Sequence, residues 1–454
     1  MRVTRALCAL VVAAAILLGP SAAHAQTPET QQSLQAEIDQ LKKDFEAIKQ
    51  QYGDRLSALE AKLGAAPGAQ PLPATPPGPP EPAQPTTPPA QPGAEGGPAP
   101  VYGASVSNAK VFNPDIAVIG DFLGAAGKNP VQPDPFGPDP HPNALQLHES
   151  EAAFQAVVDP YARADFFISF GEEGVELEEG FITLTSLPGG LLTKVGKMRA
   201  AFGKVNSLHN HVLPWADRPL VTGNLVGGED GIDDAGISVA RLIPNPWIFL
   251  EATGQLFRGD AGTDLSGNAL FQTTRRSELS YVTHLRGYKD ITDNANIDLG
   301  ASYSHGHNGV ADGNVADPGS LVTQLYGIDA TYRWKPLQRS IYHSFVGRGE
   351  WIWSRRNQAN GLQSGVGMYV SGDYQVGRRW FTGVRFDRSA HAADASLVDT
   401  GGSFIVTYWP SEFSQVRAQY RRTNYQTAPS IVTSANELLF QFQFSIGAHG
   451  AHPF

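Results

Sequence analysis

The chain contains a single cysteine, Cys8, among its 454 residues. Disulfide frameworks, cysteine-ligated metal centres and thiol nucleophiles all require this residue. Cys8 lies in an N-terminal segment that we expect to be removed on export. The sequence therefore predicts that none of the three is present in the mature protein.

Long apolar runs are equally scarce. One run, residues 6–18, follows Arg2 and Arg5, and an Ala-His-Ala triplet ends at Ala25. A short apolar run with basic residues before it and small residues after it is typical of a secretory signal peptide, so we expect residues 1–25 to be cleaved off. No later run reaches the roughly 20 residues of a membrane-spanning helix. A helical membrane protein is thus excluded, and a β-rich one is not.

Catalytic motifs and a positive net charge are also missing. The sequence holds neither the Gly-x-Ser-x-Gly elbow of serine hydrolases nor the His-Glu-x-x-His motif of zinc peptidases. We therefore expect no enzymatic activity and no cofactor. The formal net charge is −10, which argues against nucleic acid as a partner.

From residue 115 onward, apolar and polar residues alternate in segments separated by Gly, Asn, Asp and Pro. A period of two residues predicts strands with one apolar and one polar face. We expect sixteen strands, at 115–122, 145–158, 161–171, 175–187, 191–203, 231–243, 247–258, 277–291, 295–306, 321–335, 340–355, 364–377, 379–389, 402–411, 414–425 and 436–448.

The length of this pattern favours a membrane barrel over a soluble β-protein, which would show the same alternation. In the last strand Phe440, Phe442 and Phe444 oppose Gln441 and Gln443, as expected for a wall between lipid and water. Aromatic residues gather near strand ends, which is typical of interfacial girdles. The predicted fold is all-β, an antiparallel transmembrane β-barrel of about sixteen strands over residues 101–454. We place it in the cell outer membrane, in contact with outer-membrane lipid and with both ends of the barrel chain on the periplasmic side.

Two different segments precede the barrel. In residues 26–63, apolar positions from Leu34 follow alternating steps of four and three, with one extra step of four before Leu56. This pattern indicates a heptad coiled coil with a stutter, which we expect to self-associate as a trimer in the periplasm. The alternative is a single amphipathic helix lying on the barrel. Residues 64–100 hold 14 of the 34 prolines and predict an extended, semi-rigid linker.

The stretch from Lys194 to Lys204, KVGKMRAAFGK, carries the most informative charges inside the barrel region. On a strand, Lys197 and Arg199 share one face, and we expect this face to line the lumen. The opposite face is then expected to meet lipid; its members are Met198, Ala200 and Phe202.

A long segment, residues 205–231, follows and exceeds what a hairpin needs. Its apolar content predicts that it folds into the pore and narrows it. KVGKMRAAFGKVN, the later DRPLV and a Gly-rich stretch after it resemble the phosphate-selective porin O and P family of Gram-negative outer membranes. The resemblance implies a porin with an inward loop and basic residues along the conduit, here Lys197, Arg199 and Arg218. Two alanines, at positions 200 and 201, depart from the family, where proline is frequent.

Further charged residues fall on the polar face of the predicted strands. They are expected to line the pore, either as neighbouring ion pairs in a solvated lumen or as a transverse field that orients polar solutes. These residues are Glu149, Glu151, Arg163, Asp165, Arg348, Glu350, Arg385, Asp387, Arg417 and Arg421.

Histidines occur in close pairs, His209 with His211 and His305 with His307. Two imidazoles two residues apart can reach one metal ion. We treat His209 and His211 as candidate metal ligands, and exposed loop residues as the alternative.

Together these features predict a porin through which small hydrophilic or anionic solutes diffuse passively. Two other functions remain possible on the sequence. One is a metal-binding or metal-uptake channel that uses the paired histidines. The other is a tether, in which the barrel is an anchor and the coiled coil binds peptidoglycan or another periplasmic partner.

Overall fold

The computed structural model describes residues 43, 115–130, 145–171, 174–309 and 318–447. The predicted signal peptide (1–25), coiled coil (26–63) and linker (64–100) lie outside the described residues except for Lys43, and so does Phe454. No helix in the described ranges is both long and apolar enough to cross a bilayer.

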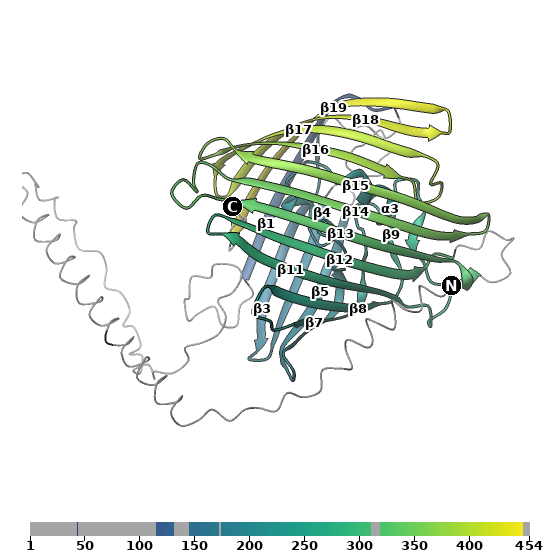
Figure 1. The fold of residues 1–454 in the computed structure, drawn as a ribbon, viewed down its shortest axis with the longest axis horizontal. Helices are drawn as coiled ribbons and strands as arrows, with labels where there is room; N and C mark the ends of the chain where they lie inside the picture. The colour runs from purple at the N-terminus through teal and green to yellow at the C-terminus, as the bar shows by residue number, and fades with distance from the viewer. Residues whose placement is uncertain (1–42, 44–114, 131–144, 172–173, 310–317, 448–454) are drawn as a thin grey trace, which may run out of the picture. The chain divides into compact units, whose positions relative to one another are not determined.

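The described chain forms one closed antiparallel β-barrel of sixteen strands (Figure 1). Each strand pairs with its neighbours in the chain, and β1 closes the ring by pairing with β19, from Ala117 opposite Gly447 to Lys128 opposite Asn436. The barrel strands are β1 (Asp115–Lys128), β3 (Ser150–Asp159, extended by β2, Leu145–Leu147), β4 (Ala162–Gly171), β5 (Gly174–Leu187), β6 (Leu191–Arg199), β7 (Asp233–Leu242), β8 (Phe249–Phe257), β11 (Ser280–Thr292), β12 (Ala295–His307), β13 (Val322–Trp334), β14 (Phe345–Gln358), β15 (Gly361–Gln375), β16 (Trp380–Ala390), β17 (Val398–Ser411), β18 (Ser414–Ala428) and β19 (Ile431–Gly447).

All sixteen predicted strands are present, with ends that differ by several residues. The segments that join them differ between the two ends of the barrel. At the end where β1 begins and β19 ends, which we call the short-turn end, the connections span at most ten residues; one such turn joins β11 to β12 through residues 293–294. The opposite long-loop end carries the connections 200–232 and 258–279. The latter contains the two-stranded hairpin of β9 (Ala261–Thr263) and β10 (Ala269–Phe271), which the alternation does not predict because each strand has three residues.

Side chains alternate between an apolar outer face and a mainly polar inner face. In β19 Phe440 and Phe442 are about half exposed, whereas Leu439, Gln441 and Gln443, which alternate with them, are buried. Gln443 donates a hydrogen bond to the carbonyl of His211 inside the barrel. The predicted division of the last strand into a lipid face and an inner face is therefore confirmed.

Aromatic side chains form clusters on the outer face near both ends. At the short-turn end the rings of Trp380 and Tyr408 lie 4.5 Å apart between centroids. Towards the long-loop end Tyr281, Tyr303 and Tyr326 follow one another around three strands, with centroids 6.0 and 5.0 Å apart. Amphipathic rings at two levels fit the interfacial girdles of a membrane barrel.

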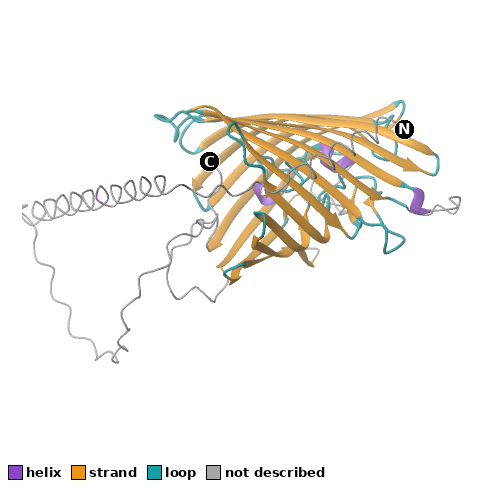
Figure 2. Cartoon of the chain, turned by 60° about the horizontal axis from the view of Figure 1, so that its bottom comes forward, coloured by secondary structure: helices purple, strands orange, loops and turns teal. Residues whose placement is uncertain are grey.

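Residues 200–232, which we call the inward segment, fold into the barrel, as predicted for 205–231. Figure 2 shows the strands inclined around the barrel, with short helical turns among them. The inward segment contains the turn η2 (Asn210–Val212) and the helix α3 (Leu220–Leu225); a third helical turn, η3 (Pro318–Ser320), lies in a long loop.

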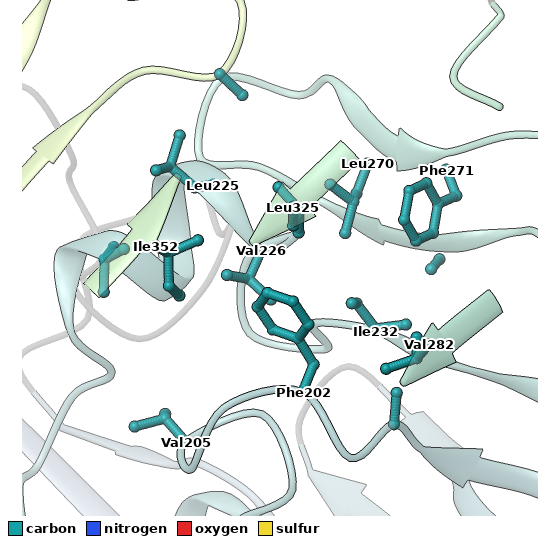
Figure 3. Close-up of a cluster of buried hydrophobic side chains, with 14 of the residues drawn as sticks. Phe202, Val205, Leu225, Val226, Ile232, Leu270, Phe271, Val282, Leu325 and Ile352 are labelled. Atoms are coloured by element: carbon teal, nitrogen blue, oxygen red, sulfur yellow. The ribbon is translucent and has the colours of Figure 1, made fainter. Parts of the chain in front are cut away.

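The inward segment packs its apolar residues against the inner faces of many strands. Phe202, Val226 and Ile232 lie beside Val282 of β11 and Leu325 of β13 (Figure 3). Ile352, Tyr369 and Ile405 extend the same cluster around the wall. A sixteen-stranded barrel is too wide for its own side chains to fill, and this segment supplies the missing core.

Candidate functional site: the charged interior around the inward segment

One carboxylate, Asp217, anchors the inward segment to the wall formed by β16 and β18. Its two oxygens accept hydrogen bonds from Arg385 Nη2 at 2.9 and 3.0 Å, and from Arg421 Nη1 at 2.7 Å. Gln419 Nε2 donates to Asp217 Oδ1 as well. Burial alone would raise the pKa of Asp217, but Arg385 and Arg421 outweigh it and lower the pKa to about 2. Asp217 is therefore ionised at neutral pH.

Arginines on the same wall hold the neighbouring part of the segment. Arg417 donates to the carbonyl of Trp215 at 2.9 Å, and the guanidinium of Arg385 lies 4.9 Å from the centroid of the Trp215 ring. Arg421 also pairs with Glu437. The predicted pore-lining residues Arg385, Arg417 and Arg421 are inner-face residues, as expected, but each is buried against the inward segment.

A second anchor surrounds His209, on the wall formed by β3 and β5. His209 Nδ1 lies 2.7 Å from Glu151 Oε2 and 3.0 Å from Glu178 Oε2, and His209 Nε2 lies 2.7 Å from Glu179 Oε2. Burial alone would lower the pKa of His209, but the three carboxylates outweigh it and raise the pKa well above its ordinary value. His211 Nδ1 lies 3.5 Å from Glu151 Oε2.

The residue between the two histidines binds a different set of carboxylates. The Asn210 amide donates to both Glu149 and Glu229, and its carbonyl oxygen accepts from Arg218 Nε at 2.9 Å. Arg218 also donates to the carbonyl of Leu208 at 2.7 Å. Arg218 therefore stabilises the fold of the inward segment.

The structure corrects the predicted faces of the KVGKMR stretch. Met198, Ala200 and Phe202 are almost completely buried and belong to the apolar cluster inside the barrel, so the prediction that they face lipid is wrong. In the strand pairing, Met198 lies opposite the buried Asp234, and Val195, two residues before Lys197, lies opposite the exposed Ile237. Alternation thus places Lys197 on the other side of the strand from Met198. Arg199, the last residue of β6, instead reaches the inward segment and Glu178.

Carboxylates neutralise both of these cations. Lys197 Nζ lies 3.2 Å from Asp233 and 3.4 Å from Glu176. Arg199 is buried, with Nη2 3.1 Å from Glu178, and it also donates to the carbonyls of residues 229 and 230. The expected pair of unbalanced lumen cations is therefore not what the structure shows.

Charged side chains towards the short-turn end are less buried. Lys204 Nζ and Arg286 Nη2 lie 3.2 and 2.7 Å from Asp298 Oδ2. Arg333 approaches the same carboxylate, and Arg348 pairs with Asp373. We call these six residues the charged vestibule: Lys204, Arg286, Asp298, Arg333, Arg348 and Asp373. The side chains of its four cations are between 23% and 38% exposed.

The remaining predicted residues lie at the edges of these clusters. Arg163 pairs with Asp165 at 2.7 Å, two residues along β4. Glu350 accepts hydrogen bonds from the backbone of Lys204 and Val205, and it therefore fixes the start of the inward segment. The sequence analysis did not assign Lys204, Arg286, Asp298 or Arg333 to the pore lining, although the polar-face alternation of β11 to β13 contains the signal for the last three.

A hollow of about 640 Å³ opens at the short-turn end beside the charged vestibule. It is bordered by the turn between β11 and β12, by Arg333 at the end of β13 and by Leu337 and Ser340 after it. Exposed charge and an open hollow therefore occur together at the short-turn end of the barrel.

Comparison with known proteins supports the barrel. The outer membrane channel DcaP of Acinetobacter baumannii superimposes with a TM-score of 0.50 over 74% of this chain and 96% of its own, at 12% identity. The fold is that of an outer-membrane barrel. The anion-selective porin of Comamonas acidovorans and OmpF of Salmonella typhi give TM-scores of 0.48 and 0.49, at 11% and 9% identity, over 73% and 75% of this chain and 99% of each porin.

Sequence comparison gives one relative of unassigned function. An uncharacterized protein of Aquifex aeolicus (strain VF5) is 28% identical over 394 residues, which cover 78% of this chain and 82% of the relative. No family model matches the chain. The resemblance of KVGKMRAAFGKVN to the phosphate-selective porins thus remains a local one.

Proposed function

We propose that this protein is an outer-membrane channel for the passive diffusion of small hydrophilic solutes, constricted by the inward segment. The observation that carries the proposal is the difference in burial between two sets of charged residues inside the barrel. Inner-face residues such as Arg385 and Arg417 are buried against the inward segment, whereas Arg286 and Arg333 of the charged vestibule are 38% exposed. A wide barrel with hydrated charges at one end fits a water-filled entrance.

The proposed channel has only a weak preference for ions of one sign. Each cation of the charged vestibule lies beside Asp298 or Asp373, so these two carboxylates offset half of its four positive charges. Lys197 and Arg199 are paired too. A strong preference for anions, and selectivity for phosphate in particular, is therefore not part of this proposal.

Recording in planar bilayers tests the channel directly. The detergent-folded protein should give stable ohmic steps. Asp217→Ala should raise the single-channel conductance or add flicker, because it leaves Arg385 and Arg421 without the carboxylate that holds the inward segment. A matched control is Asp373→Ala, which removes another arginine-paired inner carboxylate. Among the described residues Asp373 forms its ion pair with Arg348 and no hydrogen bond or ion pair with the inward segment.

Two outcomes would count against the proposal. A correctly folded barrel that stays silent, for both the natural protein and Asp217→Ala, would make the periplasmic tether the better hypothesis. Equal conductance changes in Asp217→Ala and Asp373→Ala would show that the inward segment does not set the constriction.

A further inference from the structure

Three potential metal ligands converge where the inward segment meets β3 and β5, and a fourth lies beside them. Glu151, His209 and His211 each offer one ligand atom, and these atoms lie within 4.8 Å of one another. Glu178 adds a fourth, with its Oε2 at 3.0 Å from His209 Nδ1. All four residues are buried, with at most 9% of their surface exposed. Two imidazoles and two carboxylates form a set suited to tetrahedral zinc.

The contact made by the second ring nitrogen of His209 also suits a metal ligand. Its Nε2 lies 2.7 Å from Glu179 Oε2, which leaves Nδ1 directed at Glu151 and Glu178. Metal-bound histidines commonly donate their second ring N–H to a carboxylate, because this fixes the ring and makes the ligand nitrogen more basic. Glu179 is in turn held by the backbone N–H of Arg199, which donates to its Oε1 at 2.8 Å.

Two polar atoms at the centre of this cluster lack a hydrogen-bond partner among the described residues. Glu151 Oε2 and His209 Nδ1 are 2.7 Å apart, yet both are fully buried and neither has a hydrogen bond of acceptable geometry within the described structure. A buried polar atom without a hydrogen bond costs free energy, so each such atom needs a structural explanation. Two ligand atoms that share one metal ion need no hydrogen bond to each other.

We propose that Glu151, His209, His211 and Glu178 bind one divalent transition metal ion of the zinc class. The ion would fasten the inward segment to the wall at β3 and β5, as Asp217 fastens it to β16 and β18. The inference goes beyond the proposed channel and does not depend on it, because a barrel that conducts nothing would hold the same ion.

Calorimetry and elemental analysis test this on the full chain, folded in detergent in the presence of a chelator and then freed of it. The natural protein should bind one equivalent of zinc, and bound cobalt(II) should give the visible absorption of a tetrahedral site. His211→Gln and Glu151→Gln should each remove most of the binding. Glu179→Gln should weaken it by about 10–100-fold, the usual effect of losing a ligand's outer partner.

The second histidine pair gives a matched control. His305 and His307 have the same spacing, but His305 stacks on the outward-facing Tyr281, with centroids 4.9 Å apart. His305→Gln with His307→Gln should leave zinc binding unchanged. Comparable losses in this control and in His211→Gln would overturn the proposal, because binding would then be non-specific.

Two further results decide the remaining cases. If the natural protein binds neither zinc, cobalt nor copper, His209 serves only as a protonated counter-ion for the carboxylates and the metal site is refuted. If His211→Gln does not fold, Glu179→Gln and the zinc-dependent rise in thermal midpoint of the natural protein still decide the question, since a ligand that binds only the folded state must stabilise it.

Discussion

At the scale of single residues, buried charges of the inward segment are matched one by one with charges of the wall. Asp217 faces Arg385 and Arg421, and His209 faces Glu151 and Glu178. Removing one partner of a buried ion pair typically costs about 3–5 kcal/mol, because the other charge stays buried and unpaired. Such pairs therefore determine the position in which the inward segment docks, and they contribute to the free energy of docking.

Asp217 gives a pH dependence with a definite sign. Its pKa is lowered to about 2 in the folded protein, against an ordinary value of about 3.9. Its contribution to docking is therefore fully present above about pH 4 and is lost as the pH falls towards 2. Limited pepsin digestion at the inward segment should show a large difference between the natural protein and Asp217→Asn at pH 4. That difference should shrink as the pH is lowered, and a constant difference would contradict the assignment.

The contacts between individual side chains were harder to predict from the sequence than the strands were. The charged character of the interior follows from alternation. Arg163 and Asp165, which alternation places on one face, form an ion pair. The partners of Lys197 and Arg199 were not predictable, because Glu178, Asp233 and the turn at Glu229 approach them from distant positions in the chain.

At the scale of elements, the period of two residues was sufficient to predict every barrel strand. This period failed to predict side-chain orientation beyond the end of β6, where the chain leaves the barrel wall. Beyond Arg199 no strand pairing follows, and Phe202 turns into the lumen instead of towards lipid. An apolar residue gives the same sequence pattern whether its side chain contacts lipid or an inner core. The pattern alone therefore cannot distinguish a lipid-facing residue from a core residue.

The coiled coil predicted for residues 26–63 gives a test at this scale. Deleting residues 27–63 touches no strand of the barrel, whose first strand begins at Asp115. The truncated protein should therefore fold, shown by unchanged β-sheet circular dichroism, but its oligomer mass in detergent should fall from that of a trimer. An unchanged mass, measured by light scattering, would show that the trimer forms through the barrel or that the helix has another partner.

For the whole molecule, the placement of charge predicts which substitutions alter ion preference. Arg286→Glu with Arg333→Glu reverses two exposed cations of the charged vestibule, where low-dielectric walls concentrate their field. The reversal potential in a salt gradient should shift towards cations. Lys197→Glu reverses a cation on the opposite side of its strand from Met198, already paired with Asp233, and should shift the potential much less. A larger shift for Lys197→Glu would contradict this expectation and would support the prediction from the sequence that Lys197 lines the lumen.

The ring closure between β1 and β19 also has a kinetic consequence. Ala117 pairs with Gly447, and Ala216 of the inward segment donates to Gln419, 203 residues later. Contacts between such distant positions carry a high loop-closure cost and form late in folding. The anchor of the inward segment on β16 and β18 cannot form until these late strands are in place. Complete docking of the segment must therefore wait for nearly the whole wall. Refolding should thus show a phase of strand formation, followed by a slower burial of Trp215.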